Sequence, residues 1–283
     1  MRWLTFQGPD GPRLGLVKGS GVIDVGARGG APWRSLREAL AAGVLGRAGD
    51  EFGALSADLE LAGLEFAPVV PDPEKIICVG VNYEGHRVET GRDRTEHPVL
   101  FTRFANSQVG HGRPLVRPRV SAQLDYEGEL AVVIGRRGRH VARGEALGLV
   151  AGYACYNDAS VRDWQRHTHQ FTPGKNFVGT GAFGPFLVGA DEVPDPAALL
   201  LTTRVNGAEV QRASTSELIF DVPALIAYCS TFTELAPGDV IVTGTPSGVG
   251  HKRTPPLYLK AGDVVEVEIA GVGLLRNPVV DEA

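Results

Sequence analysis

Three carboxylates lie in two short apolar stretches of this 283-residue chain. Glu127 and Glu129 lead into the run Leu-Ala-Val-Val-Ile, and Asp158 follows a second apolar run. Both runs are typical of β-strands, in which residues i and i+2 share a face, so the two glutamates project side by side. Gathered anions repel one another, and a divalent cation would relieve that repulsion; oxygen ligands favour Mg²⁺, Mn²⁺ or Ca²⁺ over Zn²⁺. The alternative is a half-exposed strand and a turn whose carboxylates are merely solvated.

A histidine and a glutamate form a second candidate for chemistry. His86 and Glu89 fall within residues 82–91, which the pattern predicts as a short helix with Asn82 as its N-cap and Gly91 as its stop. At i, i+3 spacing the two side chains share a helix face, and a carboxylate beside an imidazole fixes its tautomer and raises its basicity. That arrangement could activate a water. The alternative is an exposed helix with solvated charges; the polar segment 91–97 favours a mobile lid.

Two basic residues follow the aspartate along the chain. Arg162 could brace the metal carboxylates or bind a substrate carboxylate. Lys175 follows a Pro-Gly turn beside apolar residues, and a lysine partly buried near the anions would suit the stabilisation of negative charge. A surface lysine in a loop is the alternative.

The elements that must position these residues are mostly strands. We expect strands at 2–6, 14–17, 21–24, 75–81, 99–103, 129–134, 149–155, 186–188, 200–205, 239–242 and 264–270, and helical pieces at 33–42, near 51–59 and at 222–231. Three prolines in residues 68–73 forbid regular structure and predict a boundary between residues 1–70 and 71–283. The 37 glycines and 19 prolines fit a β-rich, turn-rich architecture.

Composition narrows the class of protein. Hydrophobic residues make up 43% of the chain, as in an ordinary globular protein, and the net charge is −5 with scattered Lys and Arg, which argues against nucleic-acid binding. No apolar run approaches the ~20 residues that span a bilayer, and the N-terminus shows no signal-peptide core. Three isolated cysteines, Cys78, Cys155 and Cys229, suggest reduced thiols and a cytoplasmic location.

Several motifs in a fixed order resemble the fumarylacetoacetate hydrolase (FAH) family between residues 75 and 277. They are Val79-Gly-Val-Asn-Tyr83, His86-x-x-Glu89, Pro98-Val-Leu-Phe101, Tyr126-Glu-Gly-Glu-Leu-Ala-Val-Val-Ile-Gly135, Asn157-Asp-x-Ser-x-Arg-Asp-x-Gln165, Gly174-Lys175, Val205-Asn-Gly207 and Pro237-Gly-Asp-Val-Ile-Val-Thr-Gly-Thr-Pro246. The resemblance implies a β-rich α+β fold, an FAH-type mixed β-sandwich roll with a small N-terminal domain at 1–70 and a catalytic domain at 71–283. It also implies a homodimer.

The resemblance further implies a role for each candidate residue. Glu127, Glu129 and Asp158 would bind Mg²⁺ or Mn²⁺, with Ca²⁺ possible in crystals; His86 and Glu89 would be a water-activating dyad on a lid, and Lys175 would stabilise negative charge. Arg162 and Gln165 would lie near metal and substrate, and the backbone N–H of Thr245 would bind a carboxylate. Many members carry Lys-Ser-Phe-Asp where this chain has Lys175-Asn-Phe-Val178, so we expect a different pocket wall.

The function implied is a metal-dependent hydrolase that cleaves a carbon–carbon bond in an acylpyruvate or related β-diketo or 2-oxo acid, in aromatic catabolism. A second hypothesis uses the same enolate for isomerisation or decarboxylation of 2-hydroxyhepta-2,4-diene-1,7-dioate type compounds, or for oxaloacetate tautomerisation or decarboxylation. A third is a non-enzymatic cation-binding protein. Both enzyme hypotheses predict a small 2-oxo acid as partner, with neither nucleic acid nor membrane involved.

Overall fold

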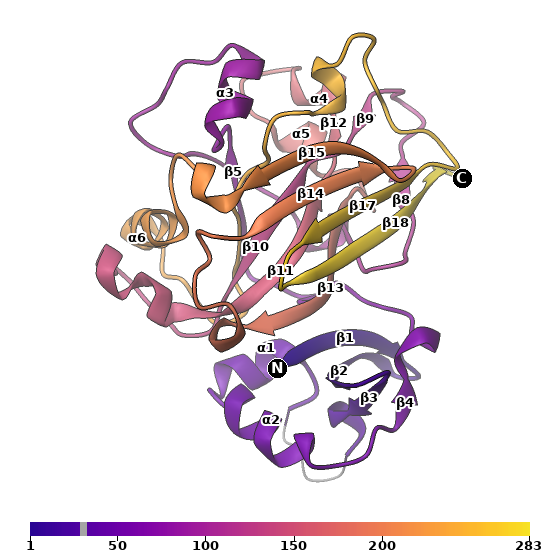
Figure 1. Cartoon of the computed structure of the whole chain (residues 1–283), viewed down its shortest axis with the longest axis vertical. Coiled ribbons are helices and arrows are strands. Elements are labelled where there is room, and N and C mark those ends of the chain that lie inside the picture. Colours follow the sequence, from indigo (N-terminus) through magenta and orange to yellow (C-terminus); the bar gives the residue numbers. More distant parts are fainter. Residues whose placement is uncertain (29–32) are drawn as a thin grey trace.

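The computed structural model describes residues 1–28 and 33–283, which form a small N-terminal lobe and a larger body (Figure 1). The lobe contains β1 (Arg2–Gly8), β2 (Gly11–Lys18), β3 (Gly21–Asp24), α1 (Leu36–Ala41), α2 (Leu45–Gly53) and β4 (Leu59–Glu60).

The helix expected near 51–59 is wrong in position: α2 packs Ala48, Gly49 and Phe52 inward at helical spacing and ends at Gly53. The prediction therefore caught only the last turn of the helix.

The larger of two main sheets runs through both parts of the chain. It contains β5 (Ile76–Gly80), β6 (Val99–Thr102), β7 (Gln108–Val109), β10 (Gly128–Ile134), β11 (Val150–Asp158), β13 (Gly181–Gly189) and β16 (Val240–Val242). Its order is β4-β3-β2-β1-β13-β11-β10-β16-β5-β6, with β7 beside β13. Because β1 pairs with β13, the lobe is hydrogen-bonded to the body, and Val69 and Val70 of the proline-rich connection are buried. The division at residue 70 stays a prediction.

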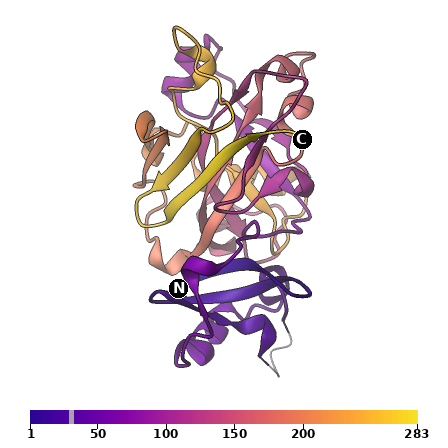
Figure 2. The same ribbon diagram turned by 90° about the vertical axis from the view of Figure 1, so that its right-hand side faces the viewer.

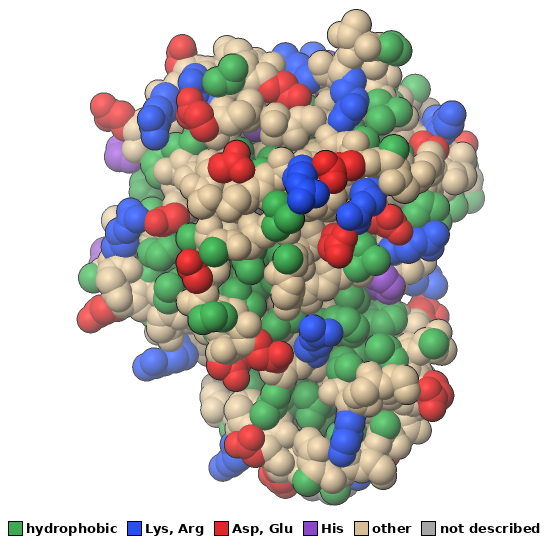
Figure 3. All heavy atoms as spheres, in the orientation of Figure 1, with side chains coloured by type: hydrophobic (Ala, Val, Ile, Leu, Met, Phe, Trp, Pro, Cys, Tyr) green, Lys and Arg blue, Asp and Glu red, His purple; other side chains and the backbone are tan. Residues whose placement is uncertain are grey.

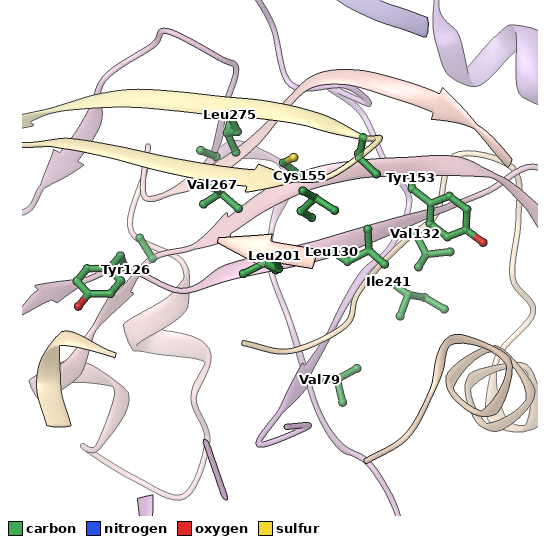
Figure 4. Close-up of a cluster of buried hydrophobic side chains, with 14 of the residues drawn as sticks. Val79, Tyr126, Leu130, Val132, Tyr153, Cys155, Leu201, Ile241, Val267 and Leu275 are labelled. Atoms are coloured by element: carbon green, nitrogen blue, oxygen red, sulfur yellow. The ribbon is translucent and has the colours of Figure 1, made fainter. Parts of the chain in front are cut away.

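A second sheet packs against the larger one. It has the order β15-β14-β17-β18-β8, from β8 (Leu115–Arg117), β14 (Leu200–Val205), β15 (Ala208–Ser214), β17 (Val264–Ile269) and β18 (Gly273–Asp281). Figure 4 shows the core between the sheets, where Leu130 and Val132 of β10 face Leu201, Val267 and Leu275 of the second sheet. The expected β-rich α+β sandwich is confirmed, although β15 and β18 had not been predicted.

Strand β10 is buried on both faces, which explains its continuous apolar run. Leu130 and Val132 belong to the core between the sheets, whereas Ala131 and Val133 pack with residues of the N-terminal lobe on the opposite face. Glu129 precedes Ala131 by two residues and therefore shares the face toward the lobe. The sequence pattern thus assigns this carboxylate to a buried face at the end of a central strand.

Short elements gather at the end of the body opposite the lobe, in both Figure 1 and Figure 2. They are α3 (Glu84–Thr90), α4 (Arg162–Gln165), α5 (Thr172–Lys175) and the pair β9 (Leu124–Asp125) with β12 (Ser160–Val161); α6 (Val222–Phe232), predicted at 222–231, lies on the flank. The strand ends that carry the three acidic residues lead into these elements, so this end of the molecule holds the candidate site.

The predicted helix at 82–91 begins two residues later than expected, and Asn82 is not its N-cap. Tyr83 caps α3, and Gly91 ends the helix in the left-handed conformation with φ +67°. The Asn82 side chain instead donates hydrogen bonds to the carbonyls of Phe220 and Thr243 and accepts one from the Phe220 amide. Asn82 therefore anchors the start of α3 to two distant loops.

Acidic and basic side chains are interspersed on the face shown in Figure 3, and apolar atoms gather in the hollow between lobe and body. Within residues 1–28 and 33–283 we find no helix with the length and hydropathy needed to cross a membrane.

Candidate metal centre and active site

Glu127, Glu129 and Asp158 converge as the sequence predicted. One carboxylate oxygen from each lies within 4.8 Å of the others, and all three side chains are buried. The register explains why: Glu129 lies opposite Tyr156, and the Asp158 amide donates to the Glu127 carbonyl, so the carboxylates come from adjacent strand ends on one face. Oxygen ligands at this spacing suit a hard divalent cation.

Glu127 is held by two cations. Lys175 Nζ lies 2.7 Å from one carboxylate oxygen and Arg162 Nη1 lies 2.7 Å from the other. Burial would raise the pKa of Glu127, but Lys175 and Arg162 outweigh it and lower the pKa to about 2. Glu127 is therefore ionised throughout the neutral range, as a metal ligand must be.

Asp158 also contacts two cations, and one of them had no signal in the sequence. Lys175 Nζ and Arg103 Nη1 each lie 2.5 Å from a different oxygen of Asp158. Arg103 is completely enclosed: its guanidinium also donates to the Ala159 carbonyl and to the hydroxyls of Thr180 and Ser107. The arginine thus fixes the orientation of Asp158 from behind.

Glu129 differs from its two neighbours. It accepts a 2.5 Å hydrogen bond from the Gly244 amide, and within the described residues no lysine or arginine pairs with it. Burial, together with Asp158 and Glu127, raises its pKa well above the usual range of a glutamate. Glu129 is therefore the one carboxylate of the three that has no cationic partner among the described residues, and a divalent cation would supply one. The donor set supports a divalent metal site without distinguishing Mg²⁺ from Mn²⁺.

The predicted dyad is formed on α3. His86 is buried, and its Nδ1 lies 3.1 Å from Glu89 Oε2. The other oxygen of Glu89 accepts a 2.9 Å hydrogen bond from the Gly248 amide. Burial would raise the pKa of Glu89, but the bonds from His86 and Gly248 lower it. The carboxylate thus orients the imidazole and ties α3 to the loop at residues 243–250.

Only glycine fits where this tie is made. Gly248 has φ +100°, and a Cβ built there would lie 2.1 Å from the Val210 carbonyl oxygen. The glycine-rich loop at residues 243–250 therefore presents a backbone amide to helix α3.

A cavity of about 260 Å³ joins the predicted residues. Those on its wall are His86, Glu127, Glu129, Arg162, Gln165, Lys175 and Thr245. Glu89 and Asp158 are not on the wall, but each contacts a residue that is: Glu89 contacts His86, and Asp158 contacts Lys175. Gln165 accepts a 3.1 Å hydrogen bond from Arg162, while the Thr245 hydroxyl donates to the Gly128 carbonyl. The structure thus brings the whole predicted set together, and the roles given to these residues stay predictions.

The cavity also contains residues to which the sequence analysis assigned no role. They are Val79, Gly80, Val81, Thr90, Arg92, Phe101, Arg166, Phe171, Val249, His251 and Lys252. Phe101 and Phe171 pack edge to face, 5.7 Å apart, and the Arg92 guanidinium lies over Phe171 at 5.4 Å. Their convergence depends on the packing of separate loops, so no spacing along the chain announces it.

Comparison with known proteins adds independent findings. The family model described as fumarylacetoacetate (FAA) hydrolase C-terminal matches residues 75–280. The chain is 40% identical to the oxaloacetate tautomerase fahd2, mitochondrial, of Xenopus laevis, over 99% of this chain and 90% of that protein. Because that relative is named mitochondrial, the cytoplasmic location stays a prediction.

Two solved structures resemble the whole chain. A fumarylacetoacetate hydrolase from Exiguobacterium antarcticum is 36% identical with a TM-score of 0.83, and covers 100% of both chains. The maleylpyruvate hydrolase of Sphingobium sp. SYK-6, in complex with manganese (II) ion and pyruvate, is 32% identical with a TM-score of 0.83 and the same coverage. The likeness therefore extends over the N-terminal lobe as well as the body.

Proposed function

Since this chain belongs to the fumarylacetoacetate hydrolase family and is a metal-dependent enzyme of that family, we propose that it interconverts the keto and enol forms of a 2-oxo acid, with oxaloacetate as the first candidate. The observation that carries this proposal is the buried carboxylate Glu129, which has no cationic partner among the described residues and shares one cavity with the His86 imidazole. Enolisation needs a cation near the 2-oxo oxygen and a base near the adjacent carbon. The three carboxylates Glu127, Glu129 and Asp158, which we call the floor of the cavity, would bind the cation, and His86 would be the base. The name of the 40% identical relative supports oxaloacetate.

Glu127, Glu129 and Asp158 would hold the cation, Mg²⁺ or Mn²⁺. When bound, it would supply Lewis-acid stabilisation of the negative charge that develops on the substrate's 2-oxo oxygen. Lys175 lies beside two of the same carboxylates and adds positive charge to the floor. With cation and lysine together, the floor would favour an enolate over a neutral ketone.

Arg162 has one donor left to offer the substrate. Its Nε and Nη1 are used by Asp125, Glu127 and Gln165, whereas its buried Nη2 has no partner among the described residues. A buried, unpaired guanidinium N–H is costly, and a substrate carboxylate would satisfy it. We assign the carboxylate beside the 2-oxo group to this donor and to the backbone N–H of Thr245, which lines the same cavity.

We assign the transfer of the substrate's C–H proton to His86. The hydrogen bond from Nδ1 to Glu89 fixes the tautomer that leaves Nε2 unprotonated and able to accept. Nε2 removes a proton from the carbon next to the 2-oxo carbon, and the electron pair of that C–H bond forms the enolate. Return of the same proton to the enolate oxygen gives the enol, so atoms and charge balance with no water consumed.

Hydrolysis of a carbon–carbon bond, the function that the sequence placed first, remains a second candidate. The observation that favours it is the same His86–Glu89 pair, which could instead deprotonate a water. The likeness to maleylpyruvate hydrolase is consistent with it. Because tautomerisation needs no water, the two candidates differ in their products.

One experiment separates the two candidates. Oxaloacetate, offered as its enol with Mg²⁺ or Mn²⁺, should lose its enol ultraviolet absorbance faster with enzyme than without it, and nuclear magnetic resonance should show a single keto product that retains all four carbons. An acylpyruvate should remain intact under the same conditions. Formation of two acids from the acylpyruvate, with no acceleration for oxaloacetate, would reverse the order of the candidates. Protein treated with a chelator is the control.

The homodimer, which the family resemblance implies, belongs to the same proposal. So do the cytoplasmic location, which rests on the three isolated cysteines, and the two-domain division, which rests on the proline-rich connection and the resemblance. Light scattering coupled to gel filtration tests the first, with a mass near twice 30.0 kDa expected.

A further inference from the structure

Cationic side chains outnumber anionic ones on the wall of the active-site cavity. Its carboxylates, Glu127 and Glu129, both belong to the floor. Two of its cations, Arg162 and Lys175, are committed to buried carboxylates. The other three, Arg92, Arg166 and Lys252, form no ion pair with any residue in the described ranges. We call these three residues the cationic rim.

Arg166 is held in place by a chain of neutral groups. Its Nη2 contacts Nε2 of His251, whose Nδ1 lies 2.7 Å from the Tyr258 hydroxyl, and that hydroxyl lies 3.3 Å from Gln123 Oε1. Burial, with Arg166 and Arg162 nearby, lowers the pKa of His251. A neutral imidazole can accept from arginine at Nε2 only if Nδ1 carries the proton and donates to Tyr258. The guanidinium is therefore oriented without being neutralised.

The rim is also tied rigidly to the floor. Asp125 accepts hydrogen bonds from Arg162 and from the amides of Gly250 and His251, which begin the short 3-10 helix at Gly250–Lys252. Arg162 and Arg166 stand four residues apart at the two ends of α4, so about one helical turn separates their backbones. Apolar side chains, among them Phe101 and Phe171, line the same cavity.

We propose that Arg166 and Lys252 bind a second anionic group of the substrate, the distal carboxylate of a dicarboxylic 2-oxo acid, while Arg92, two residues after the end of α3, faces the same group. This inference rests on the proposed function, and it assigns binding residues to the part of the substrate that lies farthest from the metal. Cations gathered without counterions repel one another, and a carboxylate relieves that repulsion through charge-assisted hydrogen bonds. The carbon chain between the two carboxylates would contact the apolar wall.

A matched pair of stable ligands tests the rim. 2-Oxoglutarate and 2-oxopentanoate have the same carbon chain and the same 2-oxo acid group, and only the first carries a distal carboxylate. With Mg²⁺ present, calorimetry on the wild-type protein should show at least ~10-fold tighter binding of 2-oxoglutarate, as expected for a charge-assisted contact. Arg166→Gln should abolish most of this preference and leave the affinity for 2-oxopentanoate unchanged.

Arg136→Gln is the control, because Arg136 is an exposed arginine outside the cavity and its loss changes the net charge equally. Lys252→Gln should reduce the same preference, which keeps the test valid if one variant folds poorly. Equal affinity of wild-type protein for the two ligands, or an equal loss in Arg166→Gln and Arg136→Gln, would overturn the rim assignment alone. Failure of wild-type protein to bind either ligand with Mg²⁺ would overturn the proposed function and the rim with it.

Discussion

The floor of the cavity, where Glu127, Glu129 and Asp158 converge, and helix α3, which we propose to be a lid, are built in opposite ways. On the floor, Arg103, Arg162 and Lys175 are buried, and each contacts at least one buried carboxylate at 2.5–2.8 Å. On the lid helix α3, the Arg87–Glu84 pair is exposed to solvent. Ion pairs enclosed by protein fix geometry strongly, whereas surface pairs contribute little. The floor is therefore set when the chain folds, and the lid depends on few contacts.

This difference predicts which region controls metal binding and folding stability and which controls turnover. A change on the floor should alter metal binding and folding stability together, because the same side chains serve both. A change on the lid should alter turnover while leaving the metal in place. Asn82 anchors the beginning of α3 and Glu89 ties its later turn to Gly248, so the lid has identifiable attachments that can be released one at a time.

The largest effect is expected from Glu129→Ala. All metal-dependent turnover should vanish, and so should the metal-dependent stabilisation, which for wild-type protein is ~2.7 kcal/mol at a hundred times the dissociation constant. Without metal, the change in stability should be small, because the removal of a buried carboxylate without a cation offsets the loss of the acceptor of the Gly244 amide. Thermal unfolding with and without Mg²⁺ measures both effects.

The control for that variant is Glu96→Ala, which removes an exposed glutamate from the polar segment after α3. It should keep the full response to Mg²⁺. An undiminished unfolding shift with Mg²⁺ in Glu129→Ala would remove this glutamate from the metal site and with it the division between floor and lid.

His86→Ala should produce the next largest effect. Loss of the base should lower turnover by ~10²–10⁴ while the affinity for Mg²⁺ stays unchanged, since the imidazole belongs to the lid. Steady-state kinetics and metal titration on one preparation provide the two measurements. His167→Ala, at an exposed position, is the matched control. Full activity of His86→Ala would show that another group moves the proton.

Arg103→Met tests whether the buried ion pairs of the floor contribute more to the free energy of unfolding than the exposed pair on α3. The change leaves one oxygen of Asp158 and the Thr180 hydroxyl without their buried donor, and breaking such a pair typically costs ~3–5 kcal/mol. Arg87→Met, which breaks the exposed pair on the lid, should leave the midpoint of chemical unfolding almost unchanged. If both variants lost stability equally, the lid would be as firmly built as the floor.

Arg103 also marks the limit of what the sequence could predict. Glu127 and Glu129 were predictable because alternation along one strand fixes their shared face, and the His86–Glu89 pair because a helix fixes spacing over one turn. Arg103 contacts Asp158 across 55 positions of sequence, and Arg166 contacts His251 across 85. Such contacts depend on how loops and strand ends pack in three dimensions, which local periodicity does not encode.

The same distinction explains the errors in the predicted elements. Asn82 has the residue type of an N-cap, but tertiary hydrogen bonds to Phe220 and Thr243 outweighed that local preference. The helix α2 was placed too late because the apolar face that fixes it begins near Ala48, before the segment that seemed helical. Strands buried on both faces, such as β10, were predicted well because their apolar runs are unambiguous.

The smallest effect, about tenfold in turnover, is expected from Glu89→Gln. The carboxylate uses one oxygen for His86 and the other for Gly248, whereas an amide has a single acceptor oxygen, so one of the two bonds is lost. Loss of one hydrogen bond to a charged group corresponds to ~1.5 kcal/mol, close to a factor of ten in rate. Glu84→Gln, on the exposed side of the same helix, should have no such effect. A loss of Mg²⁺ affinity in Glu89→Gln would show instead that lid and floor are coupled, because the altered side chain contacts none of the three metal carboxylates.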